Sequence, residues 1–248
     1  RPLVEEHARA GKSLLAEGMW TRFFPAVRKA REVLDSGAVG EAVAVQADFG
    51  WSTEGCGPDH RIWDRRSGGM TLDVAMYLAQ LGTLAFGKDA VVEHVQTVGW
   101  DVRGVDHTVV CAIKYRRPRR KNHGMLQFYV TGAANTEERV VLQCTRGRIT
   151  IHPPAHTPDK ITVSYAGDRT QEEKTEAFEY DMPKQKGPLA GTPFFYPRSE
   201  GFAYEIEAVA EAVRHQKKEM DEFDLQESLQ VATILDTMLE QLKDARNS

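Results

Sequence analysis

The sequence predicts an α+β protein with one large, open-faced and mostly antiparallel sheet that carries helices on one face. Short β-rich runs follow one another between turn residues over the second half of the chain, a spacing typical of meandering antiparallel strands. Helical periodicity appears before these runs and again at the end of the chain. A single helix–strand pair precedes the rest, as at the end of an α/β domain.

Composition limits the classes of function. The 248 residues have a formal net charge of -4, 41% hydrophobic and 27% charged residues, as in a soluble globular domain with or without an added fragment. An acidic chain favours neither nucleic acid nor an acidic membrane as a partner, and no apolar run has the length of a membrane span. Cys56, Cys111 and Cys144 are odd in number and widely separated, so we expect reduced thiols in a cytoplasmic protein.

The first residues predict a helix and a strand. Pro2 to Ala10 is typical of a helix that ends at Gly11. Ser13 to Ala16 is a short apolar run of the kind found in buried parallel strands. Because a parallel strand needs a neighbour and none precedes it, we expect residues 1–19 to be a remnant of another domain and residues 20–248 to form the main one.

The middle of the chain predicts two helices around a long strand. A helix is expected from Pro25 to Ser36, stopped by Gly37. Alternating apolar and polar residues then predict a strand from Val39 to Trp51, and Met70 to Phe86 predicts an apolar helix that Gly87 ends. Further strands are expected at 91–98, 107–115, 125–130, 139–143, 148–152, 160–165 and 176–180.

Two helices are expected at the end of the chain, after a connection rich in proline and glycine from Pro183 to Pro197. The apolar face of the first comprises Phe202, Ile206, Val209 and Val213. That of the second comprises Leu225, Leu229, Ala232, Leu235, Leu239 and Leu242.

An acid and a phenol follow the glycine pair Gly68–Gly69 at a spacing of four residues, as Asp73 and Tyr77. This spacing places both side chains on one face of a helix, so Asp73 can orient Tyr77. The glycines permit a sharp bend and a close approach of a ligand to the backbone. A carboxylate beside a phenol is suited to proton transfer, although an ordinary hydrogen bond on a helix surface has the same spacing.

Other candidates for ligand contact are aromatic or cationic. Glu17, Trp20 and Arg22 follow the predicted parallel strand, at the edge of an open α/β sheet where ligands bind. Trp20 could instead seal two layers, whereas a buried Arg22 guanidinium would need a partner that a polar ligand could supply. Trp63, in the charged loop 61–66, belongs either to a solvated loop or to a lid over a ring-shaped substrate.

Two patterns are better explained without a ligand. The basic run from Arg116 to Lys121 lies between predicted strands and contains Pro118, as in a solvated hairpin loop. His152 and His156 are four residues apart, but the two prolines between them exclude a helical metal clamp. No cysteine or carboxylate stands at ligand spacing to complete a zinc site.

Several segments together resemble one family of oxidoreductases. The run Glu17 to Pro25 (EGMWTRFFP), the turn Gly37 to Gly40, and the stretch from Gly68 through Asp73 to Tyr77 are similar to the glucose-fructose oxidoreductase, inositol dehydrogenase and MocA-type oxidoreductases. Within this family the resemblance is greatest to the branch of dimeric dihydrodiol dehydrogenases and NADP-dependent D-xylose 1-dehydrogenases. Further similarity lies at 104–106, 145–149, 201–205 and 227–229.

The resemblance implies a two-domain enzyme. Its amino-terminal Rossmann domain would bind NADP, and its carboxyl-terminal open-faced sheet would bind a small-molecule substrate and form a homodimer. This chain matches only the end of the first domain, so we expect no tight NADP binding by the chain alone, with Glu17 as its one residue near a cofactor.

The resemblance also implies roles for individual residues. By position, Tyr77 would be the general acid/base on the substrate hydroxyl and Asp73 its hydrogen-bonded support. The substrate walls would be Trp20, Arg22, Phe49 and Trp63. Ala75 departs from the family, which usually has glycine there.

Two functions stay open. One is the substrate-binding and dimerisation part of an NADP-dependent oxidoreductase that oxidises a hydroxyl of a sugar, such as a D-xylose-like aldose, or of a trans-dihydrodiol. The other is a non-redox short form, either a dimeric ligand-binding scaffold or a cofactor-independent acid/base isomerase. The catalytic lysine of the family has no counterpart here. Since a free tyrosine titrates near about 10 and needs a nearby cation to lower that value, we expect Tyr77 to stay protonated in this chain.

Overall fold

A single open sheet dominates the computed structural model, which describes residues 2–11, 13–118, 123–166, 173–184, 191–192, 194 and 196–247. Within these residues eight strands lie in the order β2-β3-β4-β1-β5-β6-β7-β8. Their bounds are β1 Ala42–Gly50, β2 Val91–Val102, β3 Val105–Arg116, β4 Gly124–Thr131, β5 Val140–Cys144, β6 Gly147–Ile151, β7 Lys160–Tyr165 and β8 Lys174–Glu179.

The pairing of the strands is antiparallel throughout the described sheet, except that β1 pairs with β4 in parallel. The predicted strands and their mostly antiparallel arrangement are confirmed. The parallel pair arises because β4 returns beside β1 only after the chain has passed through the helices and the β2–β3 hairpin. It places the carboxyl ends of β1 and β4 together, where Gly50 lies opposite Thr131.

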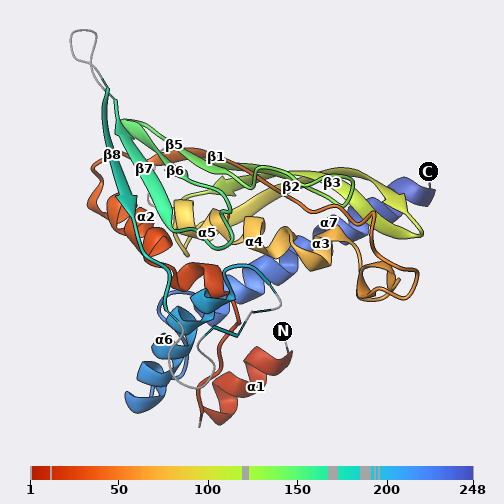
Figure 1. The fold of residues 1–248 in the computed structure, drawn as a ribbon, viewed down its shortest axis with the longest axis horizontal. Coiled ribbons are helices and arrows are strands. Elements are labelled where there is room, and N and C mark those ends of the chain that lie inside the picture. Colours follow the sequence, from red (N-terminus) through yellow and green to blue (C-terminus); the bar gives the residue numbers. More distant parts are fainter. Residues whose placement is uncertain are drawn as a thin grey trace.

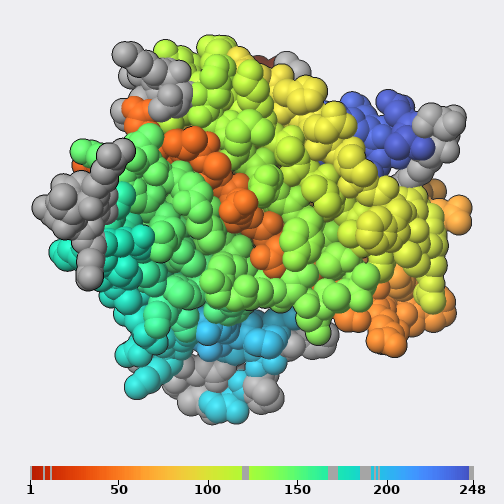
Figure 2. All heavy atoms as spheres, turned by 90° about the horizontal axis from the view of Figure 1, so that it is seen from above, coloured from red at the N-terminus to blue at the C-terminus, as the bar shows by residue number. Residues whose placement is uncertain are grey.

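Helices cover one face of the sheet (Figure 1). Their bounds are α1 Pro2–Ala10, α2 Pro25–Ser36, α3 Met70–Asp73, α4 Ala75–Ala79, α5 Leu81–Phe86, α6 Phe202–Arg214 and α7 Leu225–Asn247, with short 3₁₀ turns η1 Trp20–Phe23, η2 Arg61–Trp63 and η4 Ser199–Gly201. The view onto the opposite face shows β1 between its neighbouring strands with no helix over them (Figure 2). The α+β class with helices on one face is therefore confirmed.

Alternation along the strands explains why only one face is covered. In β3, Val109, Cys111, Ile113 and Tyr115 are buried, whereas Val110 and Lys114, which alternate with them, are exposed. Side chains of one parity therefore point to the helices and those of the other parity to the open face. The buried set joins the helices in one continuous apolar core.

Helix α2 forms as its sequence predicts. Pro25 occupies the first turn, where its missing N–H costs nothing. Gly37 ends the helix in the left-handed conformation with φ of 70°, which a residue without a Cβ adopts readily. Ala26, Val27, Ala30 and Val33 form its buried side.

Two predicted elements are wrong in detail. Ser13 to Ala16 is not a strand, because no strand of the described chain lies beside it; the Leu15 N–H instead donates to the Lys218 carbonyl at 3.0 Å. The single helix predicted over Met70 to Phe86 is divided into α3, α4 and α5. The first break is at Val74, with φ of -135°, a β-branched residue with low helix propensity.

The apolar faces predicted for the last two helices are also partly wrong. In α6, Phe202, Ile206 and Val213 are exposed, although the Phe202 ring stacks on Trp20 of η1. In α7 the buried apolar residues are Val231, Ile234, Met238 and Leu242. Its buried face is therefore rotated from the leucine face, and Ala232 is exposed.

Two further predictions concern surface segments. Residues 119–122 of the basic run lie outside the described residues, but Arg117 is buried at 9% exposure and donates to the Ala42 carbonyl at 2.8 Å. This arginine therefore links β1 to the end of β3 rather than facing solvent. None of the described helices combines the length and the apolar character needed to cross a membrane.

Candidate functional site

The glycine pair before α3 is required by close packing within the protein. Gly69 has φ of 90°, and a Cβ there would lie 2.1 Å from Asp106 Oδ1. A Cβ on Gly68 would lie 2.4 Å from the Ile62 carbonyl oxygen. The buried Asp106 carboxylate accepts from the Thr71 N–H at 2.7 Å and so satisfies a free donor at the start of α3. These contacts fix the position of the first turn of α3, which carries Asp73 and leads to Tyr77.

Asp73 is held by two side chains that precede it in the sequence. Its carboxylate accepts from Trp51 Nε1 at 2.9 Å and forms an ion pair with Arg61. The Asp73 side chain is 6% exposed. Within the described chain no hydrogen bond joins Asp73 to Tyr77, because the break at Val74 turns the two side chains apart.

The Tyr77 side chain reaches from α4 to Trp20, the first residue of η1. Its hydroxyl accepts a hydrogen bond from Trp20 Nε1 at 3.2 Å, and its side chain is half-buried. Burial raises the pKa of Tyr77, and the nearby carboxylates of Asp73 and Glu205 raise it further, against the opposing effect of the Trp20 hydrogen bond. The phenol therefore keeps its proton at neutral pH.

An aromatic cluster surrounds this hydroxyl and comprises Trp20, Phe49, Tyr77, His156 and Phe202. Phe49 lies 5.8 Å from Tyr77 and stacks on His156 at 4.7 Å between ring centroids. Phe202 stacks on Trp20 at 4.0 Å. The five residues come from η1, β1, α4, the β6–β7 loop and α6, so the fold gathers segments that are far apart in the sequence.

His156 carries the second polar group of the aromatic cluster. Its Nδ1 lies 2.5 Å from Glu138 Oε2, and its ring centroid lies 5.7 Å from that of Tyr77. His152 does not join it, since His152 Nε2 contacts the Thr162 hydroxyl at 2.7 Å. The pair therefore places an imidazole, with a carboxylate bound to it, beside the Tyr77 ring.

Arg22 is not brought to the aromatic cluster. Its guanidinium is 2% exposed and pairs with Glu227 at 2.6 Å. It also donates to the Thr83 hydroxyl at 2.7 Å and to the side chain of Gln80. The partner that a buried guanidinium needs is thus the protein itself, and Arg22 joins η1 to α5 and α7. Burial lowers the pKa of Arg22 to about 10 against the raising effect of Glu227.

Trp63 and Glu17 also lie apart from the Tyr77 hydroxyl. The Trp63 ring stacks on His107 at 6.1 Å, and the Arg103 guanidinium lies 4.7 Å from its centroid, so it packs near the β2–β3 turn. Glu17 accepts from the Ser228 hydroxyl at 2.7 Å. Its charge raises the pKa of Glu205, which burial raises first, so Glu17 affects the site at long range.

Five neighbours of the site were missed by reasoning from sequence. Trp51 and Arg61 hold Asp73, and Phe202 and the His156–Glu138 pair complete the aromatic cluster. Trp51 directly follows the strand that carries Phe49, which is a signal that could have identified it. No local pattern marks His156, since only the sheet topology brings it to Tyr77.

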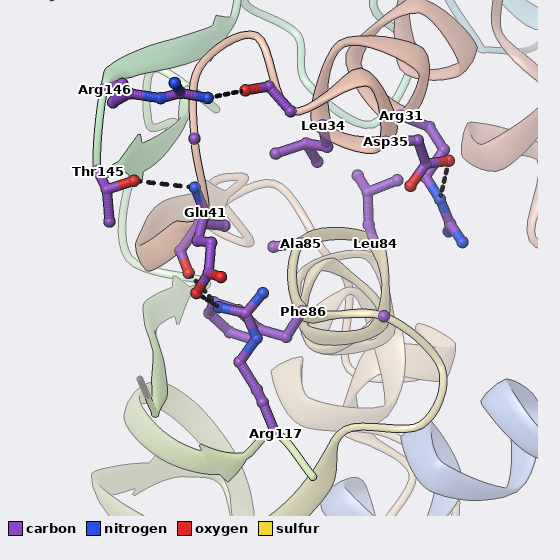
Figure 3. Close-up of a pocket in the computed structure, with 14 residues that line it drawn as sticks. Arg31, Leu34, Asp35, Glu41, Leu84, Ala85, Phe86, Arg117, Thr145 and Arg146 are labelled. Atoms are coloured by element: carbon purple, nitrogen blue, oxygen red, sulfur yellow. Dashed lines mark hydrogen bonds and ion pairs between the residues drawn. The ribbon is translucent and has the colours of Figure 1, made fainter. Parts of the chain in front are cut away.

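A large cavity of the described chain lies away from the aromatic cluster. It has a volume of about 760 Å³ and is lined by Glu41, Phe86, Arg117 and Arg146 among others (Figure 3). It borders Ala42 at the start of β1, whereas Phe49 stands near its end, about 20 Å away at the usual rise of a strand. Its arginines already contact the protein: Arg117 the Ala42 carbonyl and Arg146 the Gly37 carbonyl at 2.6 Å. We therefore place the candidate site at the aromatic cluster.

Similar proteins point to one family. The model of the GFO/IDH/MocA C-terminal domain matches residues 27–150. The trans-1,2-dihydrobenzene-1,2-diol dehydrogenase of Bos taurus is 31% identical over 238 residues, which are 95% of this chain and 64% of that protein. The Homo sapiens counterpart is 30% identical with the same coverage. The chain thus spans less than two thirds of the length of these curated relatives.

Solved structures share the fold. Levoglucosan dehydrogenase in complex with NADH and levoglucosan matches with a TM-score of 0.68 at 18% identity, covering 91% of this chain and 63% of that one. A 3-ketoreductase from Actinomadura kijaniata in complex with NADP and TDP-benzene matches with a TM-score of 0.67 at 20% identity, covering 94% and 64%. The predicted resemblance is confirmed: the chain belongs to the GFO/IDH/MocA family and corresponds to the carboxyl-terminal portion of its longer members.

Proposed function

We propose that this chain forms the substrate-binding part of an NADP-dependent oxidoreductase that oxidises a hydroxyl of a trans-dihydrodiol or a sugar. One observation carries the proposal: the Tyr77 hydroxyl is fixed by Trp20 within a half-open aromatic cluster. Aromatic faces suit the apolar faces of a cyclic diol or a sugar ring. The relatives support these substrate classes, being a dihydrodiol dehydrogenase and a levoglucosan dehydrogenase.

The step assigned to this chain is a proton transfer at Tyr77. A substrate hydroxyl that replaces or joins Trp20 at the phenol oxygen would lie within proton-transfer distance of it. The phenol is protonated here because burial and the carboxylates of Asp73 and Glu205 raise its pKa. In this state Tyr77 can donate a proton to a substrate oxygen during reduction. For oxidation it must first lose that proton, and the positive charge of Arg61, which lowers the pKa of Tyr77, is outweighed by burial and the carboxylates.

The residues present do not fit a dinucleotide. Pyrophosphate binding in this type of enzyme uses a glycine-rich loop that leads from a strand into a helix, and the sequence contains no G-x-G-x-x-G run. The segment before Trp20 is helix α1 followed by irregular chain. We therefore assign no hydride step to these residues and propose that 1–19 belong with a cofactor-binding domain and 20–248 with the substrate domain. The exposed apolar side of α6, with Phe202, Ile206 and Val213, supports contact with such a domain.

We also propose a homodimer through the open face of the sheet. Trp100, Val98 and Val110 are exposed there, and Val98 pairs with Val110 across β2 and β3. Tyr129 of β4 continues the row beside Val110. Exposed apolar patches of this kind mark interaction surfaces, and a sheet face pairs naturally with a second copy of itself.

Tyr77→Phe tests the role of the hydroxyl in the complete two-domain enzyme that the proposal implies. Losing a general acid/base should lower kcat for dihydrodiol or D-xylose oxidation by about 10²- to 10⁴-fold, with the melting temperature nearly unchanged. Tyr129→Phe on the open face, which makes the same chemical change away from the aromatic cluster, serves as the control. Unchanged turnover in Tyr77→Phe would refute the role.

A further inference from the structure

A second polar side chain faces the aromatic cluster, and the proposed proton step does not use it. The His156 ring stacks on Phe49 at 4.7 Å and lies 5.7 Å from Tyr77. It comes from the loop between β6 and β7, whereas Tyr77 comes from α4. Two polar rings from separate elements thus share one apolar wall.

The partner of His156 defines which nitrogen can bind a ligand. Glu138 Oε2 lies 2.5 Å from Nδ1, and because a carboxylate can only accept, Nδ1 carries the proton. In the neutral ring the other nitrogen, Nε2, then presents a lone pair. It makes no hydrogen bond to the described part of the chain, and the side chain is 22% exposed. Nε2 is therefore ready to accept a hydrogen bond from a ligand.

The surrounding backbone fixes this pair from both sides. Glu138 adopts the left-handed conformation with φ of 59°, which costs free energy in a residue other than glycine and persists only where neighbours enforce it. The Asp48 carboxylate accepts from the N–H groups of Glu138 at 2.8 Å and Arg139 at 3.2 Å. The Thr21 hydroxyl donates to the His156 carbonyl at 2.6 Å, so His156 is tied to the turn that carries Trp20.

We propose that His156 is a specificity-determining residue that selects vicinal diols. In this proposal, which rests on the proposed function, Tyr77 engages one hydroxyl of the substrate and His156 Nε2 accepts a hydrogen bond from the hydroxyl on the adjacent carbon. The lone pair requires a donor on the ligand, which a hydroxyl supplies and a ring hydrogen does not. Phe49, beside both rings, packs against the carbon face between the two hydroxyls.

A purely structural role would give a different result. The His156–Glu138 pair also links the β6–β7 loop to the β4–β5 loop, where the Ala155 N–H donates to the Glu138 carbonyl at 2.9 Å. If the pair served only this link, its loss would lower stability without changing the choice between ligands. Specificity and stability therefore need to be measured side by side.

The test compares trans-cyclohexane-1,2-diol with cyclohexanol as probes, binding being followed by the NMR signal of the Trp20 indole N–H. The wild-type chain should bind the diol about tenfold more tightly, the effect of one hydrogen bond to an oriented imidazole. His156→Phe keeps the stacking but removes Nε2, so it should bind both probes alike. Glu138→Gln keeps an acceptor for Nδ1 and should retain the preference. The control is His123→Phe, which makes the same substitution at a side chain that is 51% exposed beside Glu93. It should keep the wild-type preference for the diol.

Each outcome is decisive. A folded His156→Phe chain that still prefers the diol overturns the proposal, as does a wild-type chain without preference. If the melting curve shows that His156→Phe is unfolded, Glu138→Leu carries the test, because losing the acceptor for Nδ1 frees the tautomer and should reduce the preference. A Trp20 signal that responds to neither probe overturns the proposed substrate site itself.

Discussion

Tyr77 is protonated because of where its hydroxyl lies. Burial disfavours the phenolate, and the carboxylates of Asp73 and Glu205 disfavour it further. The hydrogen bond from Trp20 acts in the opposite direction but is outweighed. An enzyme that uses this phenol as a base at neutral pH must therefore bring a cation to it, and the described residues around Tyr77 do not provide one in contact with its oxygen.

The titration of Tyr77 tests this balance. Because folding raises its pKa above the ordinary value of about 10, the folded state holds the proton more tightly. The resulting stabilisation is complete below pH of about 10 and is lost as the pH rises through the folded-state pKa. The difference in near-ultraviolet phenolate absorbance between wild type and Tyr77→Phe should therefore appear only above pH of about 10. Ionisation near neutrality would contradict the account.

Arg22 provides a second test at the residue scale. Arg22→Met should leave Glu227 buried without its cation, at a cost of about 3–5 kcal/mol in the free energy of unfolding. The control is Arg28→Met, whose partner Glu222 lies 2.8 Å away at the surface and whose loss should cost about 0–1 kcal/mol. Urea unfolding measures both. Equal effects would show that Arg22 does not join η1 to the helices.

The sequence could predict residues whose roles depend on near neighbours. The Asp73 and Tyr77 spacing identified the segment that carries the phenol, and Trp20 and Phe49 do contact it. Arg22 was predicted to need a partner, but a pattern of single residues cannot show that Glu227, far along the chain, supplies it. His156 could not be found for the same reason, since its neighbours are set by the sheet order.

At the scale of elements, the divided helix is the feature that shapes the site. The break at Val74 separates α3 from α4. As a result Asp73 reaches Trp51 and Arg61 while Tyr77 reaches Trp20. The strands were predictable because alternation is visible within each of them. The helix break was not, because a single β-branched residue such as Val74 lowers helix propensity only slightly and often lies within a continuous helix.

Gly69→Ala tests how firmly the start of α3 is fixed. Its backbone, with φ of 90° and ψ of 160°, is almost exclusive to glycine, and a Cβ would collide with Asp106. The substitution should lower the free energy of unfolding by at least about 1–3 kcal/mol. Gly57→Ala, where a Cβ meets nothing within 4 Å, should change it by less than about 0.5 kcal/mol. Thermal or urea unfolding that fails to separate the two variants would contradict the packing described here.

At the scale of the whole molecule, the described residues leave two apolar surfaces uncovered. One is the open face of the sheet (Figure 2), and the other is the apolar side of α6. The sequence predicted the layers but placed the α6 residues in the core, since periodicity shows which residues share a face and not what covers that face. We propose a second copy of the chain for the first surface and a cofactor domain for the second.

A charge on the sheet face should break the proposed dimer. Val110 is 53% exposed in the middle of β3, so Val110→Asp should convert a dimer into a monomer in sedimentation or light-scattering measurements. Ile206→Asp on α6, at a side chain 65% exposed, adds the same charge elsewhere and should leave the dimer intact. A wild-type chain that is monomeric at high concentration, or a dimer lost only in Ile206→Asp, would refute the interface.

The most direct measurement of the central claim is an NMR titration of the four tryptophan indole N–H signals with trans-1,2-dihydrobenzene-1,2-diol and with D-xylose. Trp20 donates to the Tyr77 hydroxyl, so a ligand at that hydroxyl should shift the Trp20 signal in a saturable manner. Trp100 on the open face and Trp63 beside His107 should not respond. A saturable change at Trp100 or Trp63 with Trp20 unmoved would contradict the claim that the substrate binds at the aromatic cluster.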